Sequence, residues 1–314
     1  MLSHYKLRLV TKVAQLYYEK GYVQKRIADE LHLSQATISR LLKLAEEEKI
    51  VKTIVSVPSG VYSNLEAELE EKYGVKEVII AEASSDSQEE ILRGIGNAAA
   101  YYLETTLSKG DTIGISSWSA TLLSMVDSMQ QLKYLQDTKV VQILGGIGNP
   151  AAETHASHLI KRLASLVNGE AIFLPAPAVI PHGSTPENYI SDEFVKRALN
   201  MFNEVNVVLA GIGTLEPSQL LANSGNIFAK DELIELKERG AIGDICLHFF
   251  DENGEPIETS LNKRVMSMSL HQIKKVDRTI GVAGGKRKVK AIRAAIKGEY
   301  INVLITDRFT ANQL

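Results

Sequence analysis

The sequence predicts an α/β protein in which a small N-terminal helix-turn-helix domain precedes a larger domain with a mainly parallel sheet. Residues 22–46 read as two short amphipathic helices separated by a break. From residue 75 onward, short β-branched runs alternate with amphipathic helices, and glycine-rich turns follow several of those runs. A chain of 314 residues, 45% hydrophobic and 23% charged, is long enough to bury the cores of two domains.

The N-terminal domain is expected to contain three helices. Apolar side chains recur at helical spacing along residues 5–20 and again from Gln24. The break ends at Ser34, a good N-cap because its hydroxyl can accept a free amide proton of the next helix. The spacing predicts that the third helix buries Ile38, Leu41, Leu42 and Ala45.

The opposite face of the third helix is polar, which is typical of a helix that reads DNA. Short hydrogen-bonding groups lie near its N-terminal end, and cations farther along can reach phosphates. The residues predicted to contact DNA are Gln24, Ser34, Gln35, Ala36, Thr37, Ser39, Arg40 and Lys43. The alternative is an ordinary helical hairpin with a solvated polar face, since such pairs are common in helical domains.

Local charge favours DNA over that alternative. Residues 1–45 hold eight Lys or Arg against three acids, a net charge of +5, whereas the whole chain carries −3. The positive charge is therefore confined to the end that would meet a polyanion.

A strand expected over residues 50–57 would make this a winged or wing-like variant. The DNA-binding domain is accordingly placed at residues 1–57, and a hinge at 58–63, where Pro, Ser and Gly follow the strand. Residues 64–314 are expected to form the second domain, to which effector binding and oligomerisation are assigned below. It opens with an acidic helix from Asn64, its expected cap, to Tyr73.

Seven runs in this second domain predict strands. They are Val78–Ala81, Thr112–Ser116, Lys139–Leu144, Ala171–Leu174, Val205–Ala210, Ile280–Ala283 and Val303–Thr306. Because helices separate most of them, the sheet should be mainly parallel and covered on both faces. Ligands of such sheets bind at the carboxyl ends of the strands, so the turns that leave the strands are the expected site.

Four of these turns carry glycines or hydroxyl groups. In residues 114–119, hydroxyls and free amides precede a helix from about Ala120, which suits an anion such as a sugar phosphate. Residues 142–149 and 211–214 follow the same pattern, with glycines that permit close backbone approach. Tight-turn chemistry without a ligand is the alternative for each turn alone, and four turns in one sheet favour a ligand.

The fourth turn also carries three consecutive cations. Lys286, Arg287 and Lys288 enter a first helical turn directly after two glycines. Cations are poorly placed there for the helix dipole, so a bound anion would explain them.

The sequence lacks the motifs that are typical of several other classes of function. The motif GxxxxGK[ST] is absent and the glycine turns lack the third glycine of a dinucleotide fingerprint, so no cofactor is expected. Cys246 is the single cysteine and is expected to be a buried thiol, and His155, His158 and His182 lack the spacing of a zinc site. No signal segment or long apolar run occurs, which predicts a cytosolic protein without a membrane partner.

Over nearly its full length the chain resembles the SorC family of bacterial sugar-binding transcriptional regulators. The matching stretches, in order, are AQLYYEKGYVQKRIADELHLSQATISRLLKLA, DTIGISSWSAT, VVQILGGIG, VLAGIGT, GAIGDICLHFFDENG and IGVAGGKRKVKAIRAAIKGEYINVLITD. The combination is specific, although each stretch alone is modest evidence.

The resemblance implies a winged-helix-like domain joined to an effector domain with the fold of sugar-phosphate isomerases, deaminases and coenzyme A transferases. It also implies a homo-oligomer, dimer or tetramer, that binds operator DNA and senses a phosphorylated sugar or related metabolite. The effector residues it implies are Gly114, Ser116, Ser117, Trp118, Ser119, Gln142, Gly145, Gly146, Gly211, Ile212, Gly213, Asp244 and Lys288. For Asp244 the alternative is a turn or helix-end cap, and for Lys288 a solvent-exposed cation.

One departure from the family pattern matters. The branch that senses deoxyribose phosphate has a Schiff-base lysine just before the double glycine, and this sequence has Leu144 there. Covalent capture at that position is chemically impossible, which disfavours deoxyribose 5-phosphate as the effector.

The main hypothesis is thus a one-component transcription factor without enzyme activity, switched by a phosphorylated carbohydrate. An isomerase- or deaminase-like enzyme with an attached DNA-binding domain is the competing hypothesis. Asp244 and Glu153 are available for such chemistry, but no acid and base pair stands at motif spacing. A scaffold that has lost effector binding is the third possibility.

Overall fold

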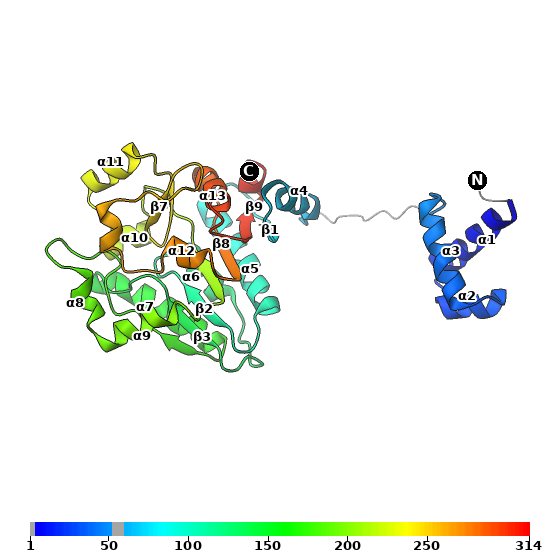
Figure 1. The fold of residues 1–314 in the computed structure, drawn as a ribbon, viewed down its shortest axis with the longest axis horizontal. Helices are drawn as coiled ribbons and strands as arrows, with labels where there is room; N and C mark the ends of the chain where they lie inside the picture. Colours follow the sequence, from blue (N-terminus) through cyan, green and yellow to red (C-terminus); the bar gives the residue numbers. More distant parts are fainter. Residues whose placement is uncertain (1–3, 52–59) are drawn as a thin grey trace. The chain divides into compact units, whose positions relative to one another are not determined.

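The computed structural model describes residues 4–51 and 60–314, without the side chains of residues 151–155 (Figure 1). The chain divides into two compact units, residues 1–58 and 59–314. Within the described residues, no helix combines the length and the apolar character that a membrane crossing requires.

The N-terminal unit is built from three helices around a small apolar core. Its elements are α1 (His4–Ala14), the π-helical turn η1 (Gln15–Glu19), α2 (Gln24–Leu31) and α3 (Gln35–Glu47). Ile27 of α2 and Ile38 of α3 are fully buried in this core. The predicted cap is confirmed, because the Ser34 hydroxyl accepts the Thr37 backbone N–H at 3.2 Å. The strand expected over 50–57 falls mostly on residues outside the described part of the chain, and Ile50 and Val51 form no strand.

The second unit contains a seven-stranded, fully parallel sheet, which confirms the prediction of a mainly parallel sheet. The strand order is β1-β9-β8-β5-β2-β3-β4. The strands are β1 (Glu77–Ala81), β2 (Thr112–Ile115), β3 (Lys139–Gln142), β4 (Glu170–Ile172), β5 (Val207–Ala210), β8 (Arg278–Val282) and β9 (Val303–Asp307). Each lies within three residues of its predicted bounds because a short buried β-branched run strongly favours a strand.

Helices cover both faces of this sheet (Figure 1). They are α4 (Ser63–Tyr73), α5 (Gln88–Thr106), α6 (Ala120–Ser128), α7 (Pro150–Leu166), α8 (Pro186–Ile190), α9 (Glu193–Met201), α10 (Gln219–Ser224), α11 (Lys230–Glu238), α12 (Leu270–Ile273), α13 (Val289–Lys297) and α14 (Arg308–Ala311), with 3-10 turns η2 (Ser260–Arg264) and η3 (Lys286–Lys288). Ile113, Leu209 and Ile280 face one apolar cluster with α5 and α6, whereas Val208 faces a second cluster with α9 and α13. The alternation of side chains along each strand therefore builds two cores.

A short antiparallel hairpin, β6 (Gly243–Ile245) and β7 (His248–Phe250), is present in addition to the seven predicted strands. Its two turn residues, Cys246 and Leu247, both adopt left-handed backbone with φ of 52° and 63°. Tight hairpin turns with two left-handed residues favour Asn-Gly, so Cys-Leu gave no turn signal. The Cys246 thiol is buried, as predicted.

Helix α4 closes one edge of the sheet. The carboxylates of Glu66 and Glu70 accept the backbone N–H groups of Ile80 and Val78, each at 2.8 Å, from the free side of the edge strand β1. The helix begins at Ser63, with Tyr62 rather than Asn64 at its N-cap. Of the predicted hinge 58–63, residues 58 and 59 lie outside the described residues.

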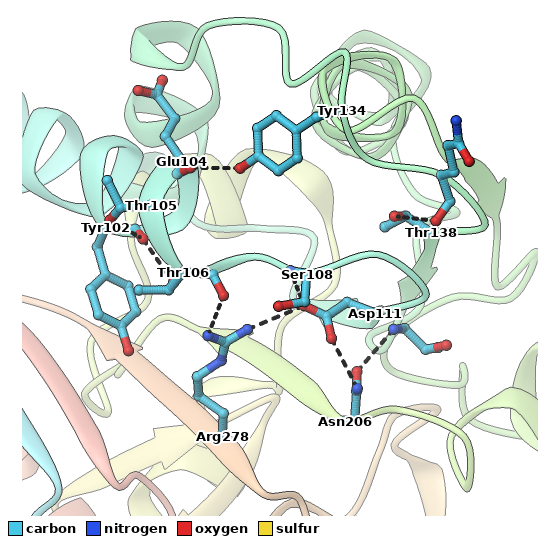
Figure 2. Close-up of polar contacts among 12 residues, drawn as sticks. Tyr102, Glu104, Thr105, Thr106, Ser108, Asp111, Tyr134, Thr138, Asn206 and Arg278 are labelled. Carbon is cyan, nitrogen blue, oxygen red and sulfur yellow. Dashed lines mark hydrogen bonds and ion pairs between the residues drawn. The ribbon is translucent and has the colours of Figure 1, made fainter.

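A partly buried polar network, centred on the buried carboxylate of Asp111, links the amino ends of the central strands. Figure 2 shows Arg278, which donates to the Thr106 carbonyl at 2.9 Å and to the Asp111 carboxylate at 3.3 Å. Asp111 also accepts the Asn206 amide at 3.0 Å and the Ser108 backbone N–H at 2.8 Å. The network joins β8 to the loop that precedes β2, so the strands are held in register at the end away from their carboxyl termini.

Candidate functional site

A cavity of about 570 Å³ lies at the carboxyl ends of the strands, where parallel sheets bind ligands. The turns after β2, β5 and β8 form its walls, together with the start of α5 and the β6–β7 hairpin. Of the residues predicted for the effector site, this cavity brings together Ser116, Trp118, Ser119, Gly211, Ile212, Gly213, Asp244 and Lys288.

The hydroxyl-rich wall follows β2. The Ser116 hydroxyl accepts the Gly211 backbone N–H at 3.5 Å, which ties the turn after β2 to the turn after β5. Ser119 caps α6 by accepting the Leu122 N–H at 3.3 Å. Trp118 is the only tryptophan of the chain, and its indole N–H donates to the Gly145 carbonyl at 2.9 Å. Trp118 therefore has a fixed orientation and is an intrinsic fluorophore in the cavity wall.

Asp244 is the buried carboxylate of the cavity. Burial raises the pKa of Asp244 to about 6, although the Leu247 N–H and the positive charge of Lys288 oppose this shift. The Leu247 N–H donates to its carboxylate at 3.1 Å, so the hairpin turn itself positions the side chain. Gly213 makes room for it, because a Cβ at position 213 would lie 1.9 Å from Asp244 Oδ1.

Lys288 is half-buried in the cavity wall, and burial lowers its pKa while the charge of Asp244 opposes this effect. A carboxylate and an ammonium group thus face one cavity. Sugar hydroxyls can donate to the carboxylate and accept from the ammonium group, so the pair can orient a polyhydroxy ligand.

Two further cations lie on the same loop and are exposed. Lys286 forms an ion pair with Asp86, and Arg287 forms one with Glu216 at 3.3 Å. All four side chains line the cavity. An anionic ligand can therefore exchange with carboxylates that already neutralise these cations.

Five predicted effector residues do not line the cavity, and buried hydrogen bonds or close packing explain their positions. The Gln142 amide donates to the Ser117 hydroxyl at 2.8 Å and accepts the Leu174 N–H at 3.0 Å. Ser117 in turn donates to the Leu144 carbonyl at 2.7 Å. The glycines at 114, 145 and 146 are required by packing, since a Cβ would collide with Ile143, Pro177 and Gln142 respectively. These residues hold in place the turns that carry the lining residues Ser116, Trp118 and Leu144.

Asp86, Gln88 and the segment 216–219 line the cavity but were not among the predicted residues. A signal for Asp86 exists, because it follows strand β1 at the same carboxyl edge of the sheet. The segment 216–219 lies in a longer loop, and its place over the cavity depends on tertiary packing.

The predicted DNA-contacting residues are all at least partly exposed on the N-terminal unit. Ser34, Gln35, Ala36, Ser39, Arg40 and Lys43 are exposed, and Gln24 and Thr37 are partly exposed. Nonpolar residues of α3 point into the core instead. The polar face is therefore accessible along the whole length of α3.

Among the described residues, no group of three His, Cys, Asp or Glu side chains is arranged to hold a metal ion. His158 lies 3.9 Å from Asp127, and His182 lies 3.4 Å from Glu232. The side chain of His155, like that of Glu153, lies outside the described part.

The chain is similar to a family of sugar-binding domains and to proteins named as regulators. The family model described as "Putative sugar-binding domain" matches residues 60–314. The deoxyribonucleoside regulator of Bacillus subtilis (strain 168) is 33% identical over 98% of this chain and 97% of its own length. The sorbitol operon regulator of Klebsiella pneumoniae is 31% identical over 98% of both chains. The crystal structure of the full-length sorbitol operon regulator SorC from Klebsiella pneumoniae matches with a TM-score of 0.74 and 30% identity, over 98% of each chain.

Proposed function

Because this chain belongs to the SorC-type family of sugar-binding transcriptional regulators, we propose that it binds operator DNA and is switched by a phosphorylated sugar. In this proposal the exposed face of α3 reads DNA and the cavity of the second unit holds the effector. The relatives are named as regulators of deoxyribonucleoside and sorbitol genes, which supports a carbohydrate effector.

The observation that carries the proposal is the division of charge in the cavity. Asp244 offers an acceptor for hydroxyl groups, whereas Lys286, Arg287 and Lys288 offer three cations from one loop. A neutral sugar could use Asp244 and Lys288, but it would leave the cations of Lys286 and Arg287 without a role in binding. A sugar phosphate uses both, since phosphate oxygens accept charge-assisted hydrogen bonds from Lys and Arg.

The DNA end of the proposal rests on α3. Gln35, Thr37 and Ser39 have side chains that can bond base edges, and Arg40 and Lys43 can contact phosphates. One helix reads only a few base pairs, so a second copy of the chain should supply a second half-site. We therefore expect a homo-oligomer, dimer or tetramer, located with its operator in the cytoplasm.

Switching requires that the effector has different affinities for two states of the protein. A ligand shifts DNA binding only if it binds the DNA-competent and incompetent states unequally. We expect the difference to arise at the ion pairs of the cations, because ligand phosphate and protein carboxylates compete for Lys286 and Arg287.

The test is a panel of sugar and sugar-alcohol phosphates, each paired with its dephosphorylated form as the matched control. Binding is measured by the change in Trp118 fluorescence. Stabilisation by the ligand is measured as the increase in the free energy of unfolding. A ligand present at 100 times its dissociation constant should stabilise the protein by about 2.7 kcal/mol. The phosphorylated compound should bind and its partner should not, and Lys288→Ala should abolish the response. Equal responses to both forms would remove the phosphate from the proposal.

The second candidate is an enzyme of the sugar-phosphate isomerase or deaminase type. Asp244 and Lys288 favour it to the extent that both titrating groups face one cavity. The same panel decides between the two, because product formation followed by NMR would establish turnover. We expect each bound compound to be recovered unchanged.

A further inference from the structure

Two sets of contacts connect the cavity to the segment through which the chain leaves toward the DNA-binding unit. Both start at residues 284–288, the loop that carries the cations of the cavity wall. Both end at Glu82, which follows β1 and does not line the cavity. Their convergence on one residue, Glu82, is the basis of the inference, which rests on the proposed function.

The first route runs through the loop between β1 and α5. Lys286 forms its ion pair with Asp86, and four residues earlier in the same loop lies Glu82. The backbone of Glu82 is packed tightly, since a Cβ at Gly94 of α5 would lie 2.4 Å from the Glu82 carbonyl oxygen. A phosphate that takes Lys286 from Asp86 therefore removes one contact of the loop that connects Glu82 to α5.

The second route runs through α14. The Gly285 backbone N–H donates to Asp307 Oδ2 at 3.0 Å and to the Thr310 hydroxyl at 2.7 Å. Asp307 and Thr310 are fully buried, so movement of the cation loop is transmitted to the start of α14. Arg308, the first residue of that helix, places its Nε 3.6 Å from Glu82 Oε1.

Glu82 holds the beginning of the second unit. Its other carboxylate oxygen accepts a hydrogen bond from the Tyr62 hydroxyl. Tyr62 is the N-cap residue of α4 and packs against the main core, and the residues before position 60 lead directly to the N-terminal unit. We propose that Glu82 is a positioning residue that couples occupancy of the cavity to residues 60–63.

The first test needs no ligand. Hydrogen exchange of the segment 60–66 is measured in the full chain for Lys286→Ala, Glu82→Gln and the double variant. Each single substitution breaks an exposed contact, so we expect exchange to rise about two- to fivefold, and the double variant should add little. Arg287→Ala is the matched control, because it breaks the ion pair of the neighbouring cation, whose partner Glu216 belongs to neither route.

Additive effects of Lys286→Ala and Glu82→Gln, or an equal rise in Arg287→Ala, would overturn the coupling. Tyr62→Phe provides an independent check, since it removes only the hydroxyl that bonds Glu82. Gln at position 82 can still accept this hydrogen bond but cannot form the ion pair with Arg308, so the two variants break successive links of the second route. Each should raise the exchange of residues 60–66.

The second test uses inorganic phosphate and sorbitol 6-phosphate as probes. In the wild-type chain, a probe that changes Trp118 fluorescence should also raise exchange in 60–66. In Glu82→Gln the fluorescence response should remain while the exchange response disappears. An exchange response that survives in Glu82→Gln refutes the proposal. If neither probe changes Trp118 fluorescence, neither compound is an effector of this protein. The ligand-free comparison of Lys286→Ala, Glu82→Gln and the double variant still tests whether Glu82 couples the cavity to residues 60–63.

Discussion

Substitution of Asp244 by Asn should change the pH dependence of stability in a calculable way. The pKa of this carboxyl is raised from 3.8 to about 6 by burial. The folded protein therefore holds the Asp244 proton more tightly than the unfolded chain does. Its contribution to stability is fully present below pH 3.8 and is lost as pH rises through about 6. A difference of roughly two pKa units corresponds to about 3 kcal/mol.

Asn at position 244 retains an oxygen that can accept the Leu247 N–H but does not titrate in this range. The stability of Asp244→Asn minus that of wild type should thus grow by about 2.4 kcal/mol between pH 4 and pH 7. Urea unfolding followed by Trp118 fluorescence measures it. Asp137→Asn is the control, because the Asp137 side chain is 81% exposed.

Parallel stability profiles for Asp244→Asn and wild type would refute the reasoning, since they would mean that the carboxyl is solvated in the folded state. The same variant should bind a sugar phosphate more weakly than wild type at pH 7.5. A gain in stability together with a loss of binding would show that Asp244 is retained for the ligand and not for the fold.

Three further predictions concern other parts of the molecule. Gly213→Ala should weaken sugar phosphate binding about tenfold or more in Trp118 titrations, because its Cβ would displace the Asp244 carboxylate; unchanged affinity would exclude Asp244 from the site. Arg278→Met should lower the free energy of unfolding by about 2–4 kcal/mol, since Asp111 stays buried without its guanidinium partner; a loss below about 1 kcal/mol would show that water replaces it. Ser34→Ala should cost the N-terminal unit about 1 kcal/mol, measured as faster exchange in the first turn of α3, and unchanged exchange would show that the cap contributes nothing.

The fold was largely predictable because its signals are local. Short buried strands such as β5 and β9 consist of apolar β-branched runs, and Ser34 stands directly before an amphipathic pattern. The location of the cavity followed from the rule for parallel sheets. The β6–β7 hairpin was not predictable, since Cys246 and Leu247 are not turn-forming residues and tertiary contacts hold them in left-handed backbone.

The site was only partly predictable because a polar side chain that follows a strand can bind either a ligand or a buried backbone group of the protein. Gln142 and Ser117 have the chemistry of ligand-binding groups, yet both are used by buried backbone groups. Local sequence does not distinguish these outcomes. They depend on tertiary packing, which brings the Leu174 N–H within hydrogen-bond distance of Gln142. The partners of Lys286 and Arg287 lie more than 70 residues away in the chain, so no spacing indicates them.

The carboxylates on α4 also bear on self-association. An unpaired edge strand is a template for another chain, and β1 would present its N–H groups if Glu66 and Glu70 were absent. The helix that follows the inter-unit segment is therefore a cover for the sheet as well as a connection. A fragment of the second unit that starts after Tyr73 should aggregate by strand addition, whereas one that starts at residue 60 keeps its edge protected. Double replacement of Glu66 and Glu70 by Ala should reproduce the aggregation in the intact chain.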